Sequence, residues 1–334
     1  MNARGEVALE DVHIEHGHRL GTGGQGSVWV VDDDRETAFK EYHPTFALKV
    51  DHSFLLQLIG LPDRLPREEA AWVLAHTAWP RAAVMNRGSV RGVLMKRAPE
   101  RFSFDANNLV RGTTRRQFSL EFLLNSDSYT AALGLHVDVT QRIRLLLNLA
   151  KTLELLHSAG VAVGDLSPKN ILVTNDSARE CFLIDCDSFS IGGISALPQT
   201  QTVDWQSIDG EAKSTPEGDS YKFGLLVARL FNRDQTSLDL SLLTSDRSAL
   251  AALVRRSFSE TPGARPTLAE WRRSLQEEVG SEGRRWPSAP PIPAPSKEPP
   301  RNSASPATSG ACAVLVTAAV VVIVLLIAGL IASH

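Results

Sequence analysis

Residues 20–30, with the sequence LGTGGQGSVWV, constrain the fold of this chain more than any other stretch. The pattern G-x-G-x-x-G-x-V is filled by Gly21, Gly23, Gly26 and Val28. Glycines let a backbone approach a phosphate chain closely, and the amide groups of such a loop can face an anion. In dinucleotide-binding folds the same glycine spacing opens a helix, whereas here the β-type run of residues 28–31 follows. The stretch therefore predicts a phosphate-binding loop between two strands, with an ordinary glycine-rich turn as the alternative.

The next strand carries a lysine. Residues 27–31 and 37–42 are β-type runs on either side of an acidic turn, and we expect them to form a hairpin. Lys40 lies on the second run, fourteen residues after Gly26. A lysine in this place can reach the α- and β-phosphates of a nucleotide under the glycine loop. The alternative is a solvated lysine at a sheet edge.

Strand-like and helical patterns divide the chain into two parts. A second strand pair is expected within residues 84–97. From about residue 139 apolar residues recur at helical spacing, and residues 219–231 are apolar nearly all round, as in a buried helix. The sequence thus predicts an α+β fold with a small β-rich lobe and a larger helical lobe.

Composition excludes several classes of protein. Of the 334 residues, 43% are hydrophobic and 22% are charged, which is typical of a globular protein with a sizeable core. The formal net charge of −3 lacks the basic excess of a nucleic-acid-binding surface, so we expect no nucleic-acid partner. Three cysteines indicate a reducing compartment, and the N-terminus has no apolar segment typical of a secretory signal.

The C-terminal residues differ from the rest of the chain. Residues 279–310 are rich in Pro and Ser and predict a disordered linker. Residues 311–332 contain no charge, and as a helix they would extend about 33 Å, enough to cross a hydrocarbon core of about 30 Å. We therefore expect a transmembrane helix in a single-pass, C-terminally anchored membrane protein, with the globular domain of residues 10–278 in the cytoplasm. Whether two copies pair as a homodimer stays open.

Two further motifs carry chemistry. The loop GDLSPKNIL places Asp165 five residues before Asn170, and Asp185 follows an apolar run fifteen residues later. With the glycine loop and Lys40, these motifs resemble those of the protein kinase superfamily, and of bacterial Ser/Thr protein kinases in particular. The resemblance extends from about residue 15 to residue 278 and implies the two-lobed protein-kinase fold.

The resemblance also implies a role for each candidate residue. Those that would bind ATP are Gly21, Gly23, Gly26, Val28 and Lys40. Asp165 would accept or orient the proton of the substrate hydroxyl, and Lys169 would reach the γ-phosphate, with a surface lysine as the alternative. Asn170 and Asp185 would hold Mg²⁺, a hard cation that takes oxygen ligands and needs few from the protein.

Two downstream segments extend the resemblance. Asp219 stands where the family has an aspartate that braces the backbone of the catalytic loop. Arg265 stands where the family has an arginine paired with an acidic residue at the end of the activation segment. We expect Asp209 to be that partner.

The catalytic motifs also depart from the family pattern. Val163 and Gly164 replace a His and an Arg, and because that Arg usually grips a phosphorylated activation loop, we expect activity that needs no such phosphate. The family's D-F-G reads Asp185, Cys186 and Asp187 here, which leaves the metal ligand in place.

The usual carboxylate partner of Lys40 is missing from its expected place. Glu68 and Glu69 come late and Asp51 comes early, so the partner is left unassigned. The lysine expected two residues after the catalytic aspartate is Ser167.

Residues and resemblance together predict an ATP-dependent protein kinase that phosphorylates Ser or Thr hydroxyls of protein substrates at the inner face of the membrane. The preference for Ser and Thr rests on the family. The alternative is a membrane-anchored pseudokinase that acts as a nucleotide-sensing scaffold, although the retained base and metal ligands argue against it. A small-molecule phosphotransferase is a third hypothesis, which the downstream kinase-like segments disfavour.

Overall fold

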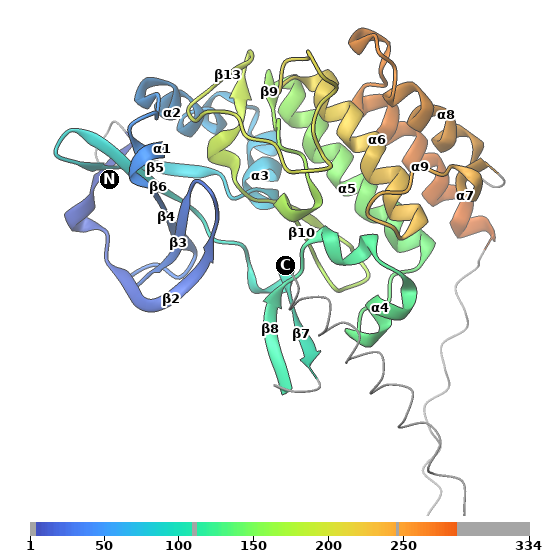
Figure 1. Cartoon of the computed structure of the whole chain (residues 1–334), viewed down its shortest axis with the longest axis horizontal. Coiled ribbons are helices and arrows are strands. Elements are labelled where there is room, and N and C mark those ends of the chain that lie inside the picture. The colour runs from blue at the N-terminus through green and yellow to red at the C-terminus, as the bar shows by residue number, and fades with distance from the viewer. Residues whose placement is uncertain (1–4, 109–111, 245–246, 286–334) are drawn as a thin grey trace, which may run out of the picture. The chain divides into compact units, whose positions relative to one another are not determined.

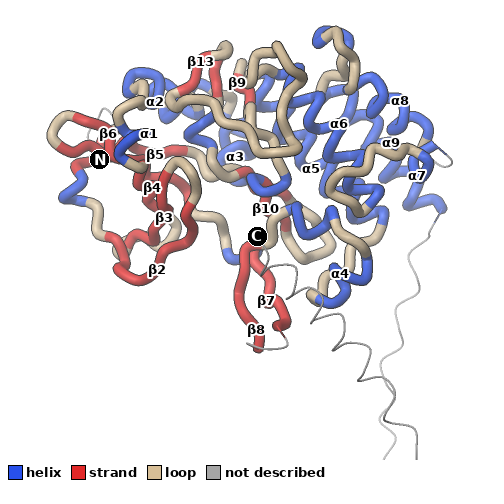
Figure 2. The backbone as a smooth tube through the Cα atoms, in the orientation of Figure 1, coloured by secondary structure: helices blue, strands red, loops and turns tan. Residues whose placement is uncertain are grey.

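The computed structural model describes residues 5–108, 112–244 and 247–285 (Figure 1). Contacts divide the chain into one unit of residues 1–288 and another of residues 289–334, and every described residue belongs to the first unit. Within this unit the strands gather in the N-terminal part and the helices in the C-terminal part, as Figure 2 shows. This is the α+β arrangement that the sequence predicts.

A six-stranded sheet forms the N-terminal part. Its strands, in spatial order, are β1 (Glu6–Ala8), β5 (Pro80–Asn86), β6 (Ser89–Lys96), β4 (Thr37–Tyr42), β3 (Gly26–Val31) and β2 (Ile14–Thr22). The glycine loop joins β2 to β3, and both predicted strand pairs are confirmed. In the β3–β4 register Val28 lies opposite Lys40, so both face the same side of the sheet.

Helices α1 (Pro44–Ala47), α2 (His52–Ile59) and α3 (Arg67–His76) lie between β4 and β5 in the chain. Helix α2 begins at a cap in which the Asp51 carboxylate accepts a hydrogen bond from the Phe54 amide at 2.9 Å. The Asp51 amide itself donates to the Ala196 carbonyl at 2.8 Å. This bond ties the sheet-rich part to the segment that follows the predicted metal ligand Asp185.

The C-terminal part is built from helices. They are α4 (Asp127–Ala132), α5 (Val139–Ser158), α6 (Pro216–Asn232), α7 (Ser241–Thr244), α8 (Ser248–Ser257) and α9 (Leu268–Arg285). Helix α5 starts at a reciprocal cap between Asp138 and Gln141, and its apolar face packs in the core. Helix α6 is buried along nearly all of its length, as predicted. Helix α9 extends past residue 279, where the linker is predicted to start.

Short strands place the catalytic motifs beside each other. They are β9 (Val161–Ala162), β10 (Ile171–Val173), β11 (Cys181–Leu183), β12 (Ser190–Ile191) and β13 (Ile194–Ser195), with a separate hairpin of β7 (Ser103–Asn108) and β8 (Gly112–Gln117). Strands β10 and β11 are antiparallel, and Ile171 lies opposite Leu183. Because antiparallel partners meet end to end, Asn170 before β10 and Asp185 after β11 reach the same place.

The predicted transmembrane anchor requires a correction. Within residues 5–108, 112–244 and 247–285, no helix is long and apolar enough to cross a membrane. The long helices α5 and α9 carry charged residues along their length, since only one face of each packs against the core. Residues 311–332, on which the prediction rested, lie outside the described residues. The interpretation as a single-pass membrane protein, and the membrane localisation drawn from it, are corrected accordingly.

Candidate active site

All nine residues predicted for the site border one cavity of about 500 Å³. They are Gly21, Gly23, Gly26, Val28, Lys40, Asp165, Lys169, Asn170 and Asp185. They come from the glycine loop, from β4 and from the two loops next to β10 and β11. Segments more than 140 residues apart in sequence, such as those of Lys40 and Asp185, thus meet at one place.

The three glycines of the loop differ in what they require. A Cβ atom at Gly26 would lie 2.1 Å from the Glu41 carbonyl oxygen, so the pairing of β3 with β4 needs glycine there. At Gly21 and Gly23 no described atom lies within 4 Å of an added Cβ. These two glycines border the open space of the cavity, where a ligand could approach the backbone closely.

Lys40 is the buried cation of the site, with a side chain only 3% exposed. Its Nζ donates to Asp187 Oδ1 at 2.9 Å, to Gln25 Oε1 at 3.0 Å and to Asp185 Oδ1 at 3.2 Å. Burial alone would lower the pKa of Lys40, but the carboxylates of Asp187 and Asp185 raise it above its ordinary value. The side chain is therefore an ammonium ion and suits an anionic ligand.

The catalytic loop, residues 163–170, is held in place from below by α6. The carboxylate of Asp219, which is fully buried, accepts hydrogen bonds from the amides of Val163 at 2.7 Å and Gly164 at 2.9 Å. His157 Nε2 lies 3.0 Å from the same carboxylate. The bracing contact predicted for Asp219 is thus present, and it fixes the backbone just before Asp165.

Asp165 meets a threonine hydroxyl. Thr202 Oγ1 donates to Asp165 Oδ2 at 3.0 Å, and the Thr202 amide donates to Oδ1 at 2.9 Å. Asn170 Nδ2 also donates to Oδ2, at 3.1 Å. The carboxylate at the predicted base position therefore already receives an alcohol in hydrogen-bonding geometry.

The chemistry of Asn170 and Asp185 fits a magnesium ion bound together with a nucleotide. The amide nitrogen of Asn170 is used by Asp165, so its oxygen is the atom left to bind a cation. The Asp185 side chain is 43% exposed and borders the cavity. Its backbone is left-handed, with φ of 59°, a strained conformation that clusters at functional sites. These are hard oxygen donors on either side of a cavity with space for phosphates.

Lys169 has the least defined environment of the predicted residues. Its side chain is 61% exposed, and Nζ lies 3.6 Å from Glu121 Oε1. It borders the cavity from the outside. An exposed pair of this kind contributes about 0–1 kcal/mol, so Lys169 can leave Glu121 for a stronger anion at small cost.

The activation segment, residues 188–215, packs directly against Gly164. This glycine has a φ of 77°, and an added Cβ would lie 2.6 Å from Ser214 Oγ and 2.7 Å from Gln199 Oε1. A side chain as large as the family's arginine has no place here. The position of the missing arginine is filled by the activation segment itself.

A buried lysine joins the catalytic loop to the activation segment. Lys222 of α6 donates through Nζ to the Gly164 carbonyl oxygen. With the Gln201 amide turned to satisfy its neighbours, Gln201 Oε1 accepts from the same Nζ at 2.8 Å. Burial lowers the pKa of Lys222, and nearby Asp219 and Asp165 offset part of that effect. Contacts that need no phosphate thus fix both segments.

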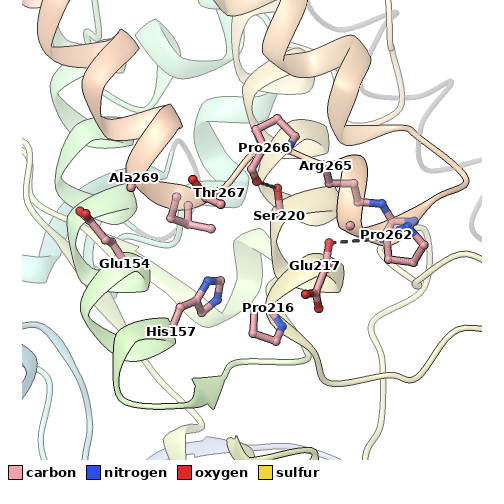
Figure 3. Close-up of a pocket in the computed structure, with 12 residues that line it drawn as sticks. Glu154, His157, Pro216, Glu217, Ser220, Pro262, Arg265, Pro266, Thr267 and Ala269 are labelled. Carbon is pink, nitrogen blue, oxygen red and sulfur yellow. Dashed lines mark hydrogen bonds between the residues drawn. The ribbon is translucent and has the colours of Figure 1, made fainter.

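The partner predicted for Arg265 was wrong. Arg265 pairs with both carboxylate oxygens of Glu211, one of them at 2.9 Å from Nη1, rather than with Asp209, which is exposed. Arg265 also donates to the Glu217 carbonyl oxygen at 3.2 Å, as Figure 3 shows. It borders a second pocket, of about 260 Å³, between α5, α6 and the start of α9. None of the nine predicted site residues lies there.

Three functional candidates were missed from the sequence. Asp187 was noted only as a replacement in the D-F-G position, although it lies 2.9 Å from Lys40. Thr202 and Lys222 carry no motif of their own, so no signal in the sequence could have found them. Their importance follows only from what they contact.

Comparisons with known proteins point in the same direction. No family model matches the chain. It is similar to the proteins named "Protein kinase YegI" in Escherichia coli O157:H7 and strain K12, each 28% identical over 192 and 189 residues, or 55% and 54% of this chain. It is 24% identical over 158 residues, 40% of its length, to "Probable serine/threonine-protein kinase gdt2" of Dictyostelium discoideum. The matches span only 25%, 24% and 10% of those three proteins. The chain is thus similar to protein kinases, at low identity and over about half of its length.

Proposed function

We propose that this protein is an ATP-dependent protein kinase that transfers the γ-phosphate to Ser or Thr hydroxyls of protein substrates. The observation that carries the proposal is the single cavity bordered by the glycine loop, Lys40, Asp165, Asn170 and Asp185. Bound MgATP supplies the phosphoryl group, and the cation neutralises charge on the phosphates. The names of the similar proteins support the class of reaction.

Each residue then has a task in positioning or in charge stabilisation. Lys40 holds the phosphates, and Lys169 leaves Glu121 to contact the outermost phosphate. Asn170 and Asp185 hold the cation. Asp165 accepts the proton of the attacking hydroxyl, and its contact with Thr202 supports an alcohol of Ser or Thr type in that position. Positioning and electrostatic stabilisation provide most of the rate enhancement in this reaction.

Activity that needs no phosphate on the activation segment is part of the proposal. It is supported by the packing of Ser214 and Gln199 against Gly164 and by the buried contacts of Lys222. These contacts order the segment through groups that are always present.

One observation favours a second candidate function. Both oxygens of Asp165 accept hydrogen bonds from Thr202, so a substrate hydroxyl has to displace that residue or share the carboxylate with it. A nucleotide-binding module without phosphoryl transfer, a pseudokinase, would keep Thr202 in place permanently. The two candidates make different predictions about transfer, not about nucleotide binding.

The test uses the full chain with labelled ATP, Mg²⁺ and a generic acceptor protein. We expect transfer by the wild type, and by Asp63→Ala, which removes an exposed carboxylate far from the cavity in sequence. Asp165→Ala and Asp185→Ala should each abolish transfer. Treatment of the wild type with a phosphatase beforehand should leave its rate unchanged.

Three results would decide differently. Nucleotide binding without transfer by the wild type indicates the pseudokinase. Absence of both binding and transfer rejects a nucleotide site altogether. Transfer that survives in Asp185→Ala means that the metal site is misassigned.

A further inference from the structure

The flexible side chain of a lysine needs a fixed acceptor if it is to hold a nucleotide's phosphates at one place. In protein kinases that acceptor is a glutamate on a helix of the N-terminal lobe. Here the helix carboxylates that come nearest in sequence have other surroundings. Asp51 caps α2, and Glu68 is exposed on the first turn of α3. No printed contact joins either of them to Lys40 within the described residues.

Of the three groups that do accept from Lys40, only one is free for this task. Gln25 belongs to the glycine loop and occupies the side from which phosphates would arrive. Asp185 is 43% exposed and borders the cavity, as a cation ligand should. The remaining acceptor is Asp187, at 2.9 Å.

Asp187 is fixed from both sides. Its side chain is 1% exposed, Oδ1 accepts from Lys40, and Oδ2 accepts from the Tyr42 hydroxyl at 2.9 Å. Tyr42 is itself buried on β4, two residues after Lys40. With both oxygens used inside the protein and no exposed surface, Asp187 is not placed to bind a cation in the cavity.

We propose that Asp187 is the positioning residue of Lys40 and takes the part that a helix-borne glutamate plays in protein kinases. The assignment rests on the proposed function, because it requires that a nucleotide occupies the cavity. Asp187 acts through Lys40 and does not touch the nucleotide.

The location of this partner has a regulatory consequence. Asp185 and Asp187 are two residues apart on one 3₁₀ turn, whose first residues are held by Ser188 and Phe189 amide bonds. The lysine anchor therefore assembles together with the metal ligand. No helix has to move toward the cavity to complete the ion pair, so the pair is not a point at which helix movement can control this site.

The test measures binding of ADP and of adenosine to the full chain by calorimetry, with and without Mg²⁺. Because Lys40 contacts phosphates only, Asp187→Asn should weaken ADP binding by about tenfold or more and leave adenosine binding within about twofold. The loss should persist without Mg²⁺. Lys40→Met should show the same pattern, and the double variant should bind ADP no more weakly than Lys40→Met alone.

Each alternative result overturns a defined part. Equal loss of ADP and adenosine binding in Asp187→Asn means general damage to the cavity, and a loss seen only with Mg²⁺ means that Asp187 is a cation ligand; either refutes the assignment. Unchanged ADP binding refutes it too, while the proposed function stands. Absence of ADP binding by the wild type rejects the proposed function and, with it, this role.

A folding defect of Asp187→Asn would still be informative. If the variant does not fold but the double variant with Lys40→Met does, the unpaired buried ammonium is the cause, as the assignment requires. If neither folds, Asp187 supports the fold independently of Lys40 and the assignment is refuted.

Discussion

The substitution Gly164→Ala tests whether the activation segment is packed against the catalytic loop as described. It imposes two separate costs. The first is conformational, since a non-glycine residue at a φ of 77° costs about 1–2 kcal/mol. The second is steric, because the new Cβ would lie 2.6 Å from Ser214 Oγ and 2.7 Å from Gln199 Oε1. Overpacking of this kind costs about 1–3 kcal/mol.

A matched control separates the two costs. Gly134 has nearly the same backbone, with a φ of 76°, but no described atom lies within 4 Å of an added Cβ. Gly134→Ala should therefore lower the free energy of unfolding by the conformational term alone, about 1–2 kcal/mol. Gly164→Ala should lower it by about 2–5 kcal/mol. Urea unfolding followed by circular dichroism measures both.

A second substitution tests the identity of the clash. Ser214→Ala removes the nearer of the two oxygens, so Gly164→Ala should cost less in that background than in the wild type. Equal costs for Gly164→Ala and Gly134→Ala would show that nothing packs against the catalytic loop at this position. The explanation for activity without a phosphate would then lose its structural basis.

Further predictions concern buried polar groups. Asp219→Asn should lower the free energy of unfolding by about 2–4 kcal/mol in urea, because donors that now face a carboxylate meet an amide; a cost below about 1 kcal/mol would contradict this. Burial, and then the Asp187 charge, raise the pKa of Tyr42, so its protonated form stabilises the fold below about pH 10 and this contribution is lost as the pH rises further. Tyrosinate absorbance from Tyr42 should appear only with alkaline unfolding, and titration near pH 10 in the folded protein would argue against its burial. Glu211→Gln should cost about 3 kcal/mol because it leaves a buried arginine without its charge partner, whereas Asp209→Asn should cost less than about 0.5 kcal/mol, and similar costs for both would reinstate Asp209.

The strands around Lys40 and the helices α5 and α6 could be predicted because their signals are local. Alternating apolar residues in 37–42 and helical spacing from residue 139 arise from elements that bury one side. The candidate site could be predicted for the same reason: each motif carries its own spacing, and the kinase resemblance supplies their order.

The errors and gaps concern partners, which depend on how distant segments meet. The partner of Lys40 was sought within the next thirty residues or so, yet Asp187 lies 147 positions later. The partner of Arg265 was placed two residues away from Glu211, because the path of an irregular segment has no period that a sequence could show. The transmembrane helix was inferred from composition alone, in residues outside those that the structure describes.

The hydrogen bond from the Asp51 amide to the Ala196 carbonyl has a mechanical consequence. It is a strap between the two sides of the cavity, placed away from the chain connection after β6. If the sides separate to admit a nucleotide, the strap has to break or it pulls residues 190–196 along. Opening for nucleotide exchange and displacement of the segment that carries Thr202 are therefore linked movements. Amide exchange at Asp51 should report on both, faster in the free protein than with ADP bound.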